Sequence, residues 1–196
     1  MRDHRSFLES RLLHRRKTTK MAFEYKITAK FAPNDLARFG PLIPGRVALP
    51  TSQNPTDGIG GFFLIDTGAS NCFIDQSVAD ELGIRSRGMV TSHGLGGSVD
   101  VPRHQVTLFI PAKPLGGNYP PQAVAMLGFV QEVGTVSLNR HHEGLENIPG
   151  RVLGALGRNI LQFTRTVYDG MAGTTTIEID EAIQRPKVAN QPPPQH

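Results

Sequence analysis

The chain is poor in cysteine and has no long apolar run, and each scarcity excludes a class of protein. Among its 196 residues there is one cysteine, Cys72, so an internal disulfide framework is excluded and a cysteine-based metal site is disfavoured. No run of 18 apolar residues occurs, so no membrane span is expected. The basic N-terminal stretch lacks the apolar segment of a secretory signal, because polar and charged residues interrupt its leucines. These absences predict a cytoplasmic protein.

The chain has almost no net charge outside its N-terminal segment. Residues 1–20 hold seven basic and two acidic side chains, a net +5, and the remaining 14 basic and 15 acidic side chains give −1. The formal charge of +4 therefore describes the tail rather than the folded part, and no nucleic-acid partner is expected. One alternative has the basic tail bring the domain to RNA or a membrane surface, which deletion of residues 1–20 would test.

The length and composition indicate one folded domain between two tails. With 38% hydrophobic residues the chain can bury one sizeable core. We expect a basic N-terminal tail at 1–22, a domain at 23–182 and a disordered Pro/Gln-rich tail at 183–196.

Short β-type segments separated by turn residues predict a mostly β, closed barrel-like domain. The expected strands share apolar alternation or β-branched content and are Phe23–Phe31, Pro41–Pro50, Phe62–Ile65, Val99–Ile110, Ala123–Val130 and Thr174–Ile179. The prolines confine the second strand to an edge or a turn, and Pro111–Pro121 and Asn139–Pro149 are expected loops. One short helix is predicted at Asp75–Gly83, capped by the aspartate and ended by a left-handed glycine.

The segment Phe62–Ser70 carries the strongest functional signal. An apolar strand ends in Asp66, followed by Thr67 and Gly68. An ionised carboxylate at the end of a buried strand needs partners, which the Thr67 hydroxyl and the backbone N–H groups of the glycine turn could supply. For an isolated Asp-Thr-Gly, a plain turn in which the aspartate caps its own backbone is the simpler interpretation.

Three motifs together resemble the aspartic proteases. Phe62–Ser70 resembles their active-site loop, and Val152–Leu161 resembles the apolar strand and Gly-Arg-Asn-x-Leu helix start of retropepsins. Between them, His93–Gly97 resembles the glycine-rich flap hairpin. The similarity spans roughly residues 40–179 and is closest in kind to the bacterial-type relatives of retroviral proteases.

The resemblance implies a retropepsin-like closed barrel with one or two short helices, active as a symmetric homodimer without a cofactor or metal. The segments 23–31 and 41–50 would form a hairpin leading into the catalytic strand. A peptide or protein would be the substrate, hydrolysed as by an aspartic endopeptidase. The catalytic residues would be Asp66 as general acid/base, Thr67 with a hydrogen bond across the dimer that holds the two loops rigid, and Gly68 with a backbone N–H directed at the carboxylate. The substrate contacts would be Ala69, Ser70, Gly94, Leu95, Gly96, Gly97 and Leu156.

The need for a dimer also follows from the chemistry of peptide hydrolysis. Two carboxylates must share one proton around a water, and this chain has a single Asp-Thr-Gly. Asp57 and Asp169 precede glycine directly, without the hydroxyl residue. A two-fold axis would place Asp66 beside its copy in the partner. By resemblance, the final strand Thr174–Ile179 is expected at the interface.

Three interpretations stay open. By resemblance Arg158 would form an ion pair that braces the dimer, whereas a surface arginine at a helix start is an equally good interpretation. His141-His142-Glu143 suggests a metal, but neighbouring side chains diverge and no third ligand has zinc-like spacing. Finally, the same fold could serve as a non-catalytic peptide-binding or dimerisation module, although a binding cleft does not need a proton-sharing acid.

Overall fold

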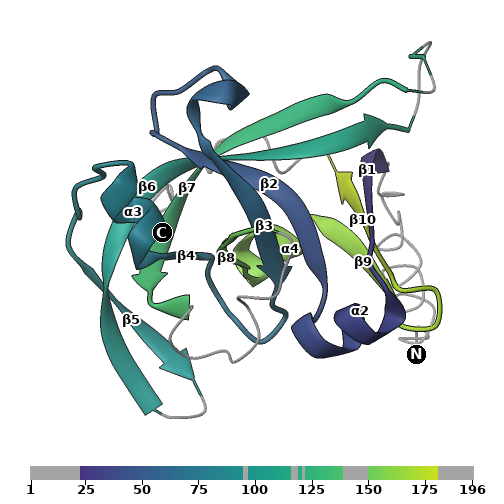
Figure 1. Ribbon diagram of the computed structural model, residues 1–196. Coiled ribbons are helices and arrows are strands. Elements are labelled where there is room, and N and C mark those ends of the chain that lie inside the picture. Colours follow the sequence, from purple (N-terminus) through teal and green to yellow (C-terminus); the bar gives the residue numbers. More distant parts are fainter. Residues whose placement is uncertain (1–22, 95–96, 116–118, 121, 139–149, 181–196) are drawn as a thin grey trace, which may run out of the picture.

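The computed structural model describes residues 23–94, 97–115, 119–120, 122–138 and 150–180 (Figure 1). The two predicted tails, 1–22 and 183–196, and the expected loop at 139–149 lie outside these ranges. Among the described residues, none of the helices has the length and apolar character needed to cross a membrane.

Strands dominate the described part of the chain, which confirms the mostly β prediction. They are β1 (Phe23–Lys30), β2 (Leu42–Ala48), β3 (Ile59–Ile65), β4 (Phe73–Asp75), β5 (Met89–Gly94), β6 (Gly97–Pro114), β7 (Ala125–Val136), β8 (Val152–Leu156), β9 (Thr164–Asp169) and β10 (Thr174–Asp180). The helices are short: α2 (Pro33–Phe39), α3 (Gln76–Glu81), α4 (Arg158–Leu161) and the 3-10 turn η1 (Pro55–Asp57).

Six of the strands close into a barrel, as predicted. The order is β2-β3-β8-β4-β7-β6, and β6 returns to pair with β2 over Arg46–Ala48. The β3–β8 and β4–β7 pairs are parallel, and the other pairs of the barrel are antiparallel. Strand β3, which precedes Asp66, lies between β2 and β8 in this barrel and is hydrogen-bonded to both.

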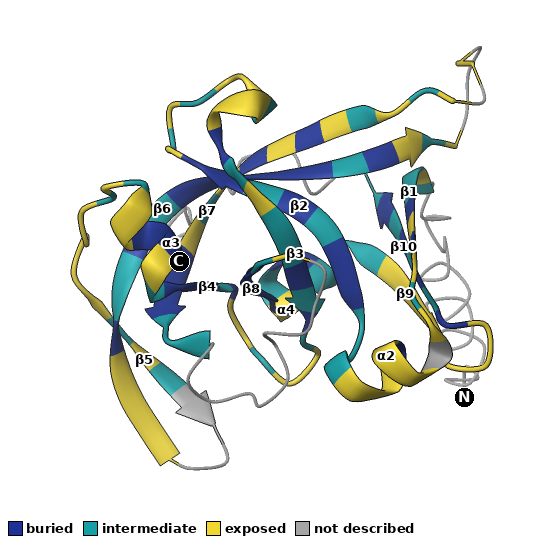
Figure 2. Cartoon of the chain, in the orientation of Figure 1, coloured by how far each residue is buried: buried dark blue, intermediate teal, exposed yellow. Residues whose placement is uncertain are grey.

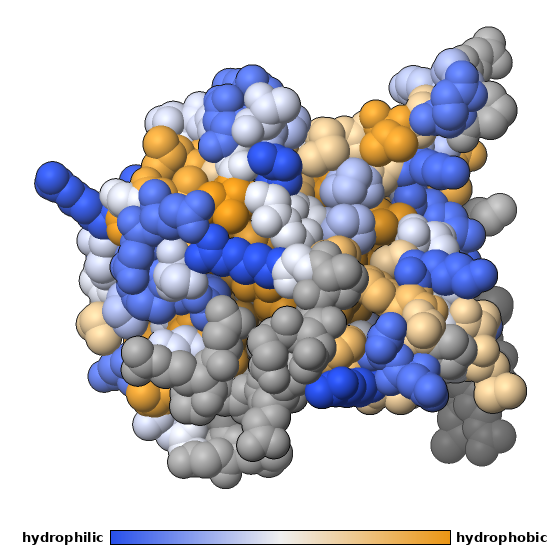
Figure 3. Space-filling model, in the orientation of Figure 1, coloured by the Kyte–Doolittle hydropathy of each residue, from blue (hydrophilic) through white to orange (hydrophobic). Residues whose placement is uncertain are grey.

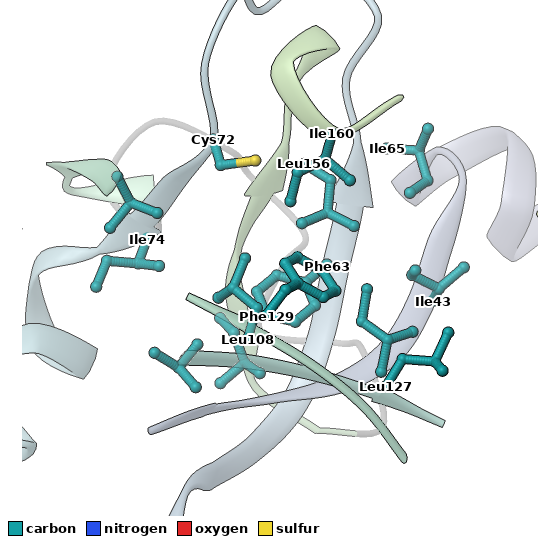
Figure 4. Packing of buried hydrophobic residues seen from close by; sticks show 14 of the residues in the cluster. Ile43, Phe63, Ile65, Cys72, Ile74, Leu108, Leu127, Phe129, Leu156 and Ile160 are labelled. Carbon is teal, nitrogen blue, oxygen red and sulfur yellow. The ribbon is translucent and has the colours of Figure 1, made fainter. Parts of the chain in front are cut away.

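The barrel interior is filled by side chains from alternate strand positions. Phe63, Leu108, Phe129 and Leu156 point into one cluster (Figure 4). Because neighbouring positions on a strand face opposite sides of the sheet, the same strands show buried and exposed residues in alternation (Figure 2). On the face drawn in Figure 3, hydrophilic side chains lie between smaller hydrophobic areas.

Three strands lie beside the barrel in the order β1-β10-β9 (Figure 1). β1 pairs with β10 along its length and joins the barrel through a short pairing of Tyr25 and Lys26 with the end of β6. The expected hairpin between the first two extended segments is therefore wrong. Helix α2 separates these segments, and β1 takes the C-terminal strand β10 as its partner.

The structure also differs from the sequence prediction at helix α2 and at the end of β6. Helix α2 was missed, although its signals were readable: proline in the first turn and Gly40 with φ of 78° just beyond the end. The loop expected from Pro111 begins later, because β6 continues to Pro114 against β7 and β1. Pro44 does fit its expectation, since β2 is paired there with β3 only and β6 joins from Arg46.

Helix α3 is fixed by Asp75, as predicted. One carboxylate oxygen, Oδ1, accepts from the backbone N–H of Ser77 at 3.0 Å and also from the Ser77 hydroxyl. The other, Oδ2, accepts from the backbone N–H of Leu138 at 2.9 Å. Asp75 is 4% exposed, so it joins the helix start to the end of β7 inside the protein. Gly83 follows the helix with φ of 64°.

We predict that Asp75→Ala lowers the free energy of unfolding by about 2 kcal/mol, because it removes the helix cap and leaves the Leu138 N–H without its acceptor. Asp80→Ala on the same helix is the matched control, since Asp80 is exposed and its carboxylate accepts, among the described residues, only from Gln76 Nε2 at 2.8 Å. Its effect should stay within about 0.5 kcal/mol. Chemical denaturation measures both, and equal losses would contradict the role of Asp75.

Candidate active site

The loop that follows β3 presents the predicted catalytic residues. Strand β3 is held by β2 on one side and β8 on the other up to Ile65. The Asp66 backbone N–H then donates to Leu156 O at 3.1 Å, which extends the contact with β8 by one residue. Thr67, Gly68 and Ser70 are exposed, whereas Asp66 and Ala69 are half-buried. The barrel therefore presents the carboxylate on a short, accessible turn.

One oxygen of the Asp66 carboxylate is fixed by the turn. Oδ1 accepts from the backbone N–H of Gly68 at 2.8 Å and from that of Ala69 at 3.2 Å. Oδ2 has no hydrogen-bond partner among the described residues. The turn thus has the self-capping geometry of the simpler interpretation, and it also leaves one oxygen free for chemistry. A Cβ on Gly68 would lie 3.1 Å from Oδ1, closer than ordinary van der Waals contact, so a side chain there would require the Asp66 carboxylate to shift.

Thr67 does not support Asp66 within the chain. The sequence had offered its hydroxyl as a partner for the carboxylate, but the Gly68 and Ala69 backbone N–H groups occupy that place. The Thr67 hydroxyl has no hydrogen-bond partner among the described residues, and the residue is exposed. This leaves the hydroxyl available for contact with another molecule.

The start of helix α4 holds the far side of the loop. The backbone N–H groups of Arg158 and Asn159 donate to Ala69 O at 2.9 Å and to Ser70 O at 3.1 Å. Gly157 permits this approach, because a Cβ there would lie 2.3 Å from Asn71 O. Residues 69–71 and the helix start are therefore packed backbone to backbone.

Cys72 joins the same two segments from the interior, beside Leu156 and Ile160 (Figure 4). Its thiol donates to Asn159 Oδ1 at 3.2 Å, and its sulfur accepts from the Gly157 backbone N–H at 3.3 Å. Cys72 is 1% exposed, which confirms the interpretation as a small buried residue. Sequence reasoning missed that Cys72 and Asn159 support the site; the Gly-Arg-Asn motif was the available signal.

Arg158 lies against the turn that follows Asp66. Its Nη1 donates to Thr67 O and Gly68 O, both at 2.9 Å, and its Nη2 donates to Ser70 Oγ at 2.7 Å. No carboxylate of the described residues lies within ion-pair distance of it. The ion pair that the resemblance implied is not made within the described part of this chain.

The predicted flap is a hairpin of β5 and the first part of β6. Residues Met89–Gly94 pair with Gly97–Pro102, and Gly97 has φ of 109°. Of the expected substrate contacts, Gly94 and Gly97 lie at the end of this hairpin, while Leu95 and Gly96 lie outside the described residues. The hairpin and the loop after β3 lie toward the lower side of the view in Figure 1, and the far end of the β6–β7 hairpin extends away from them.

The expectation that the Leu156 side chain contacts substrate needs correction. Leu156 is 1% exposed and belongs to the core, because β8 is an inner strand of the barrel. It meets the site through its backbone carbonyl, which accepts from Asp66 N–H. The candidate metal residues 141–143 lie outside the described residues. Within the described residues, no cluster of three possible metal ligands occurs.

Comparison with known proteins agrees with this geometry. Residues 57–110 match the family model described as "Aspartyl protease", a range that covers the Asp66 loop, α3, the flap hairpin and most of β6. No curated protein matches the chain.

The match supports a retropepsin-like aspartyl protease. It also supports a protease type of function. Helix α4 lies outside the matched range, so its part in the candidate site is carried by the contacts of Gly157, Arg158 and Asn159 with residues 67–72.

We predict that Gly157→Ala lowers the proteolytic activity at least about tenfold and destabilises the fold by about 1–3 kcal/mol, because the new methyl group would push the loop away from α4. Gly170→Ala is the matched control, since the nearest atom to its Cβ would be Tyr168 Cε1 at 3.4 Å. Peptide cleavage and thermal unfolding measure both variants. Wild-type values for Gly157→Ala would show that the backbone contact does not position the loop.

Proposed function

We propose that the chain is an aspartic endopeptidase that works as a symmetric homodimer, in which water is activated between the two Asp66 carboxylates. The observation that carries the proposal is the asymmetry of the Asp66 carboxylate. Oδ1 is held by two backbone N–H groups, and Oδ2 has no partner within the described chain. A carboxylate that is fixed by one oxygen and free at the other is prepared to bind a water or a second acid.

The proposed reaction uses the two carboxylates in different protonation states. Two acids about 3 Å apart do not both ionise readily, so the pair holds one proton. The ionised Asp66 takes a proton from the water, whose oxygen attacks the peptide carbonyl. The protonated Asp66 donates to the carbonyl oxygen. Collapse of the tetrahedral intermediate then breaks the C–N bond, with a proton passed to the leaving nitrogen.

Two features of the loop support a two-fold arrangement. Asp66 lies in an exposed turn, and the exposed Thr67 hydroxyl lacks a partner within the described chain. Across a two-fold axis each threonine can bond the partner loop and hold both turns in place. The second acid and the partner of this hydroxyl would then come from the same second copy.

The sheet beside the barrel offers an edge for that contact. The final strand β10, which the family resemblance led us to expect at the interface, is already paired with β1 and β9. Among the described strands β9 ends the order, and its residues 165–169 are exposed. An exposed edge with unpaired backbone groups is suited to pairing with another chain. We therefore assign the dimer contact to β9 rather than to β10.

We predict that Asp66→Asn reduces peptide cleavage by about 100- to 10,000-fold while the dimer remains folded, because the amide is nearly isosteric but cannot share a proton. Asp57→Asn is the matched control: it also precedes glycine, is exposed and should keep wild-type activity. Cleavage of a diverse peptide library and sedimentation measure these effects. Peptide binding without any wild-type cleavage would instead favour the binding-module alternative.

We also predict that Val167→Lys on β9 weakens the dimer at least about tenfold, because two-fold pairing would bring the new charges close together. Val167 is 49% exposed, and Val124→Lys, at a residue 58% exposed near the start of β7, is the control. Sedimentation and specific activity over a dilution series measure the effect. Specific activity that stays constant on dilution to a demonstrated monomer would contradict the dimer requirement itself.

A further inference from the structure

The guanidinium of Arg158 is held beside the catalytic turn. It donates to the backbone carbonyls of Thr67 and Gly68 at 2.9 Å and to the hydroxyl of Ser70 at 2.7 Å. These acceptors belong to the residues directly after Asp66. The positive charge is therefore fixed at the edge of the site, on an exposed side chain.

The acceptors around Arg158 are all neutral. A guanidinium has five N–H donors, and the bonds above leave two of them without an acceptor among the described residues. Three other arginines of the described chain have carboxylate partners: Arg103 with Glu132, Arg151 with Glu81 and Arg165 with Glu178. Arg158 has no acid of the described chain within ion-pair distance, and the same holds for four other described arginines (Arg38, Arg46, Arg85 and Arg87). Among the described arginines, Arg158 is the one whose guanidinium is held against the loop after Asp66.

We propose that Arg158 and Ser70 form a substrate subsite that is selective for acidic residues. The carboxylate of a substrate Asp or Glu would bind there, close to the scissile bond. This rests on the proposed function, since it concerns the peptide that the same site would cleave. Arginine binds carboxylates through paired, charge-assisted hydrogen bonds, and two N–H donors of Arg158 have no acceptor among the described residues. A glutamine or asparagine of the same shape offers one oxygen and no charge, so the site should discriminate against it.

The first test uses peptides that differ only by Glu or Gln at one position at a time on either side of the cleaved bond. We expect Glu to be favoured in kcat/KM at least about fivefold at one position, with the preference falling as salt is added. Binding of the same peptides to Asp66→Asn gives a readout that does not need cleavage. Equal kcat/KM and equal binding for Glu and Gln at every position would overturn the proposal.

Variants of Ser70 test the subsite while Arg158 stays in place. Ser70→Asp puts a carboxylate where the hydroxyl now accepts from Arg158, so the guanidinium is neutralised from within the chain. The Glu/Gln ratio should then fall to about one, whereas the uncharged control Ser70→Asn should retain it. An unchanged ratio in Ser70→Asp would show that the preference arises elsewhere.

Arg158→Gln and Arg158→Lys separate the subsite from a dimer brace. For a subsite, Arg158→Gln removes the Glu/Gln ratio and Arg158→Lys retains part of it, with the dimer intact by sedimentation. If Arg158 instead pairs with an acid of the partner, Arg158→Gln dissociates the dimer and the wild type shows no preference for Glu. Absence of any cleavage by wild type, together with a Glu preference in binding, would refute the proposed function and leave the subsite standing.

Discussion

The packing of the Asp66 loop against the start of helix α4 is the constraint on which the candidate site depends. The loop leaves β3 beside β8, and α4 begins directly after β8, so the parallel pairing of these two inner strands brings both segments to one end of the barrel. Backbone hydrogen bonds from Arg158 and Asn159 then fix the loop from one side. A side chain at Gly157 would occupy the space of Asn71, so the contact depends on the absence of a Cβ.

This packing explains why so few side chains support the carboxylate. The turn itself supplies two N–H donors to Asp66 Oδ1, and Leu156 O receives the Asp66 N–H. Because backbone groups make these hydrogen bonds with Asp66, the neighbouring side chains are available for other contacts. Thr67 is left exposed, and Arg158 is turned toward the loop with its charge uncompensated among the described residues. The accessible part of the site is therefore a free carboxylate oxygen, a hydroxyl and a guanidinium.

Much of the architecture was readable from local sequence pattern. Apolar or β-branched patterns predicted β1, β2, β3, β6, β7 and β10, whereas β4 and β9 were not predicted. Asp75 with Gly83 predicted the bounds of α3 to within two residues. The segment Phe62–Ser70 indicated the candidate site only together with two further motifs, His93–Gly97 and Val152–Leu161, because an isolated Asp-Thr-Gly is equally compatible with a plain turn. The first hairpin was predicted wrongly, because strand order depends on which distant strand is available, and β10 is more than 140 positions from β1.

The sequence by itself determined that one chain carries a single Asp-Thr-Gly acid in a mostly β domain, because motif and periodicity are local properties. Only the tertiary structure decided how the acid is held: the hydroxyl of Thr67 is not its partner, the Leu156 side chain lies in the core, and Cys72 bonds Asn159. It also decided that β10 is an inner strand and β9 an edge. These outcomes depend on contacts between residues far apart in the chain, and no local pattern specifies which groups remain unpaired once the barrel has closed.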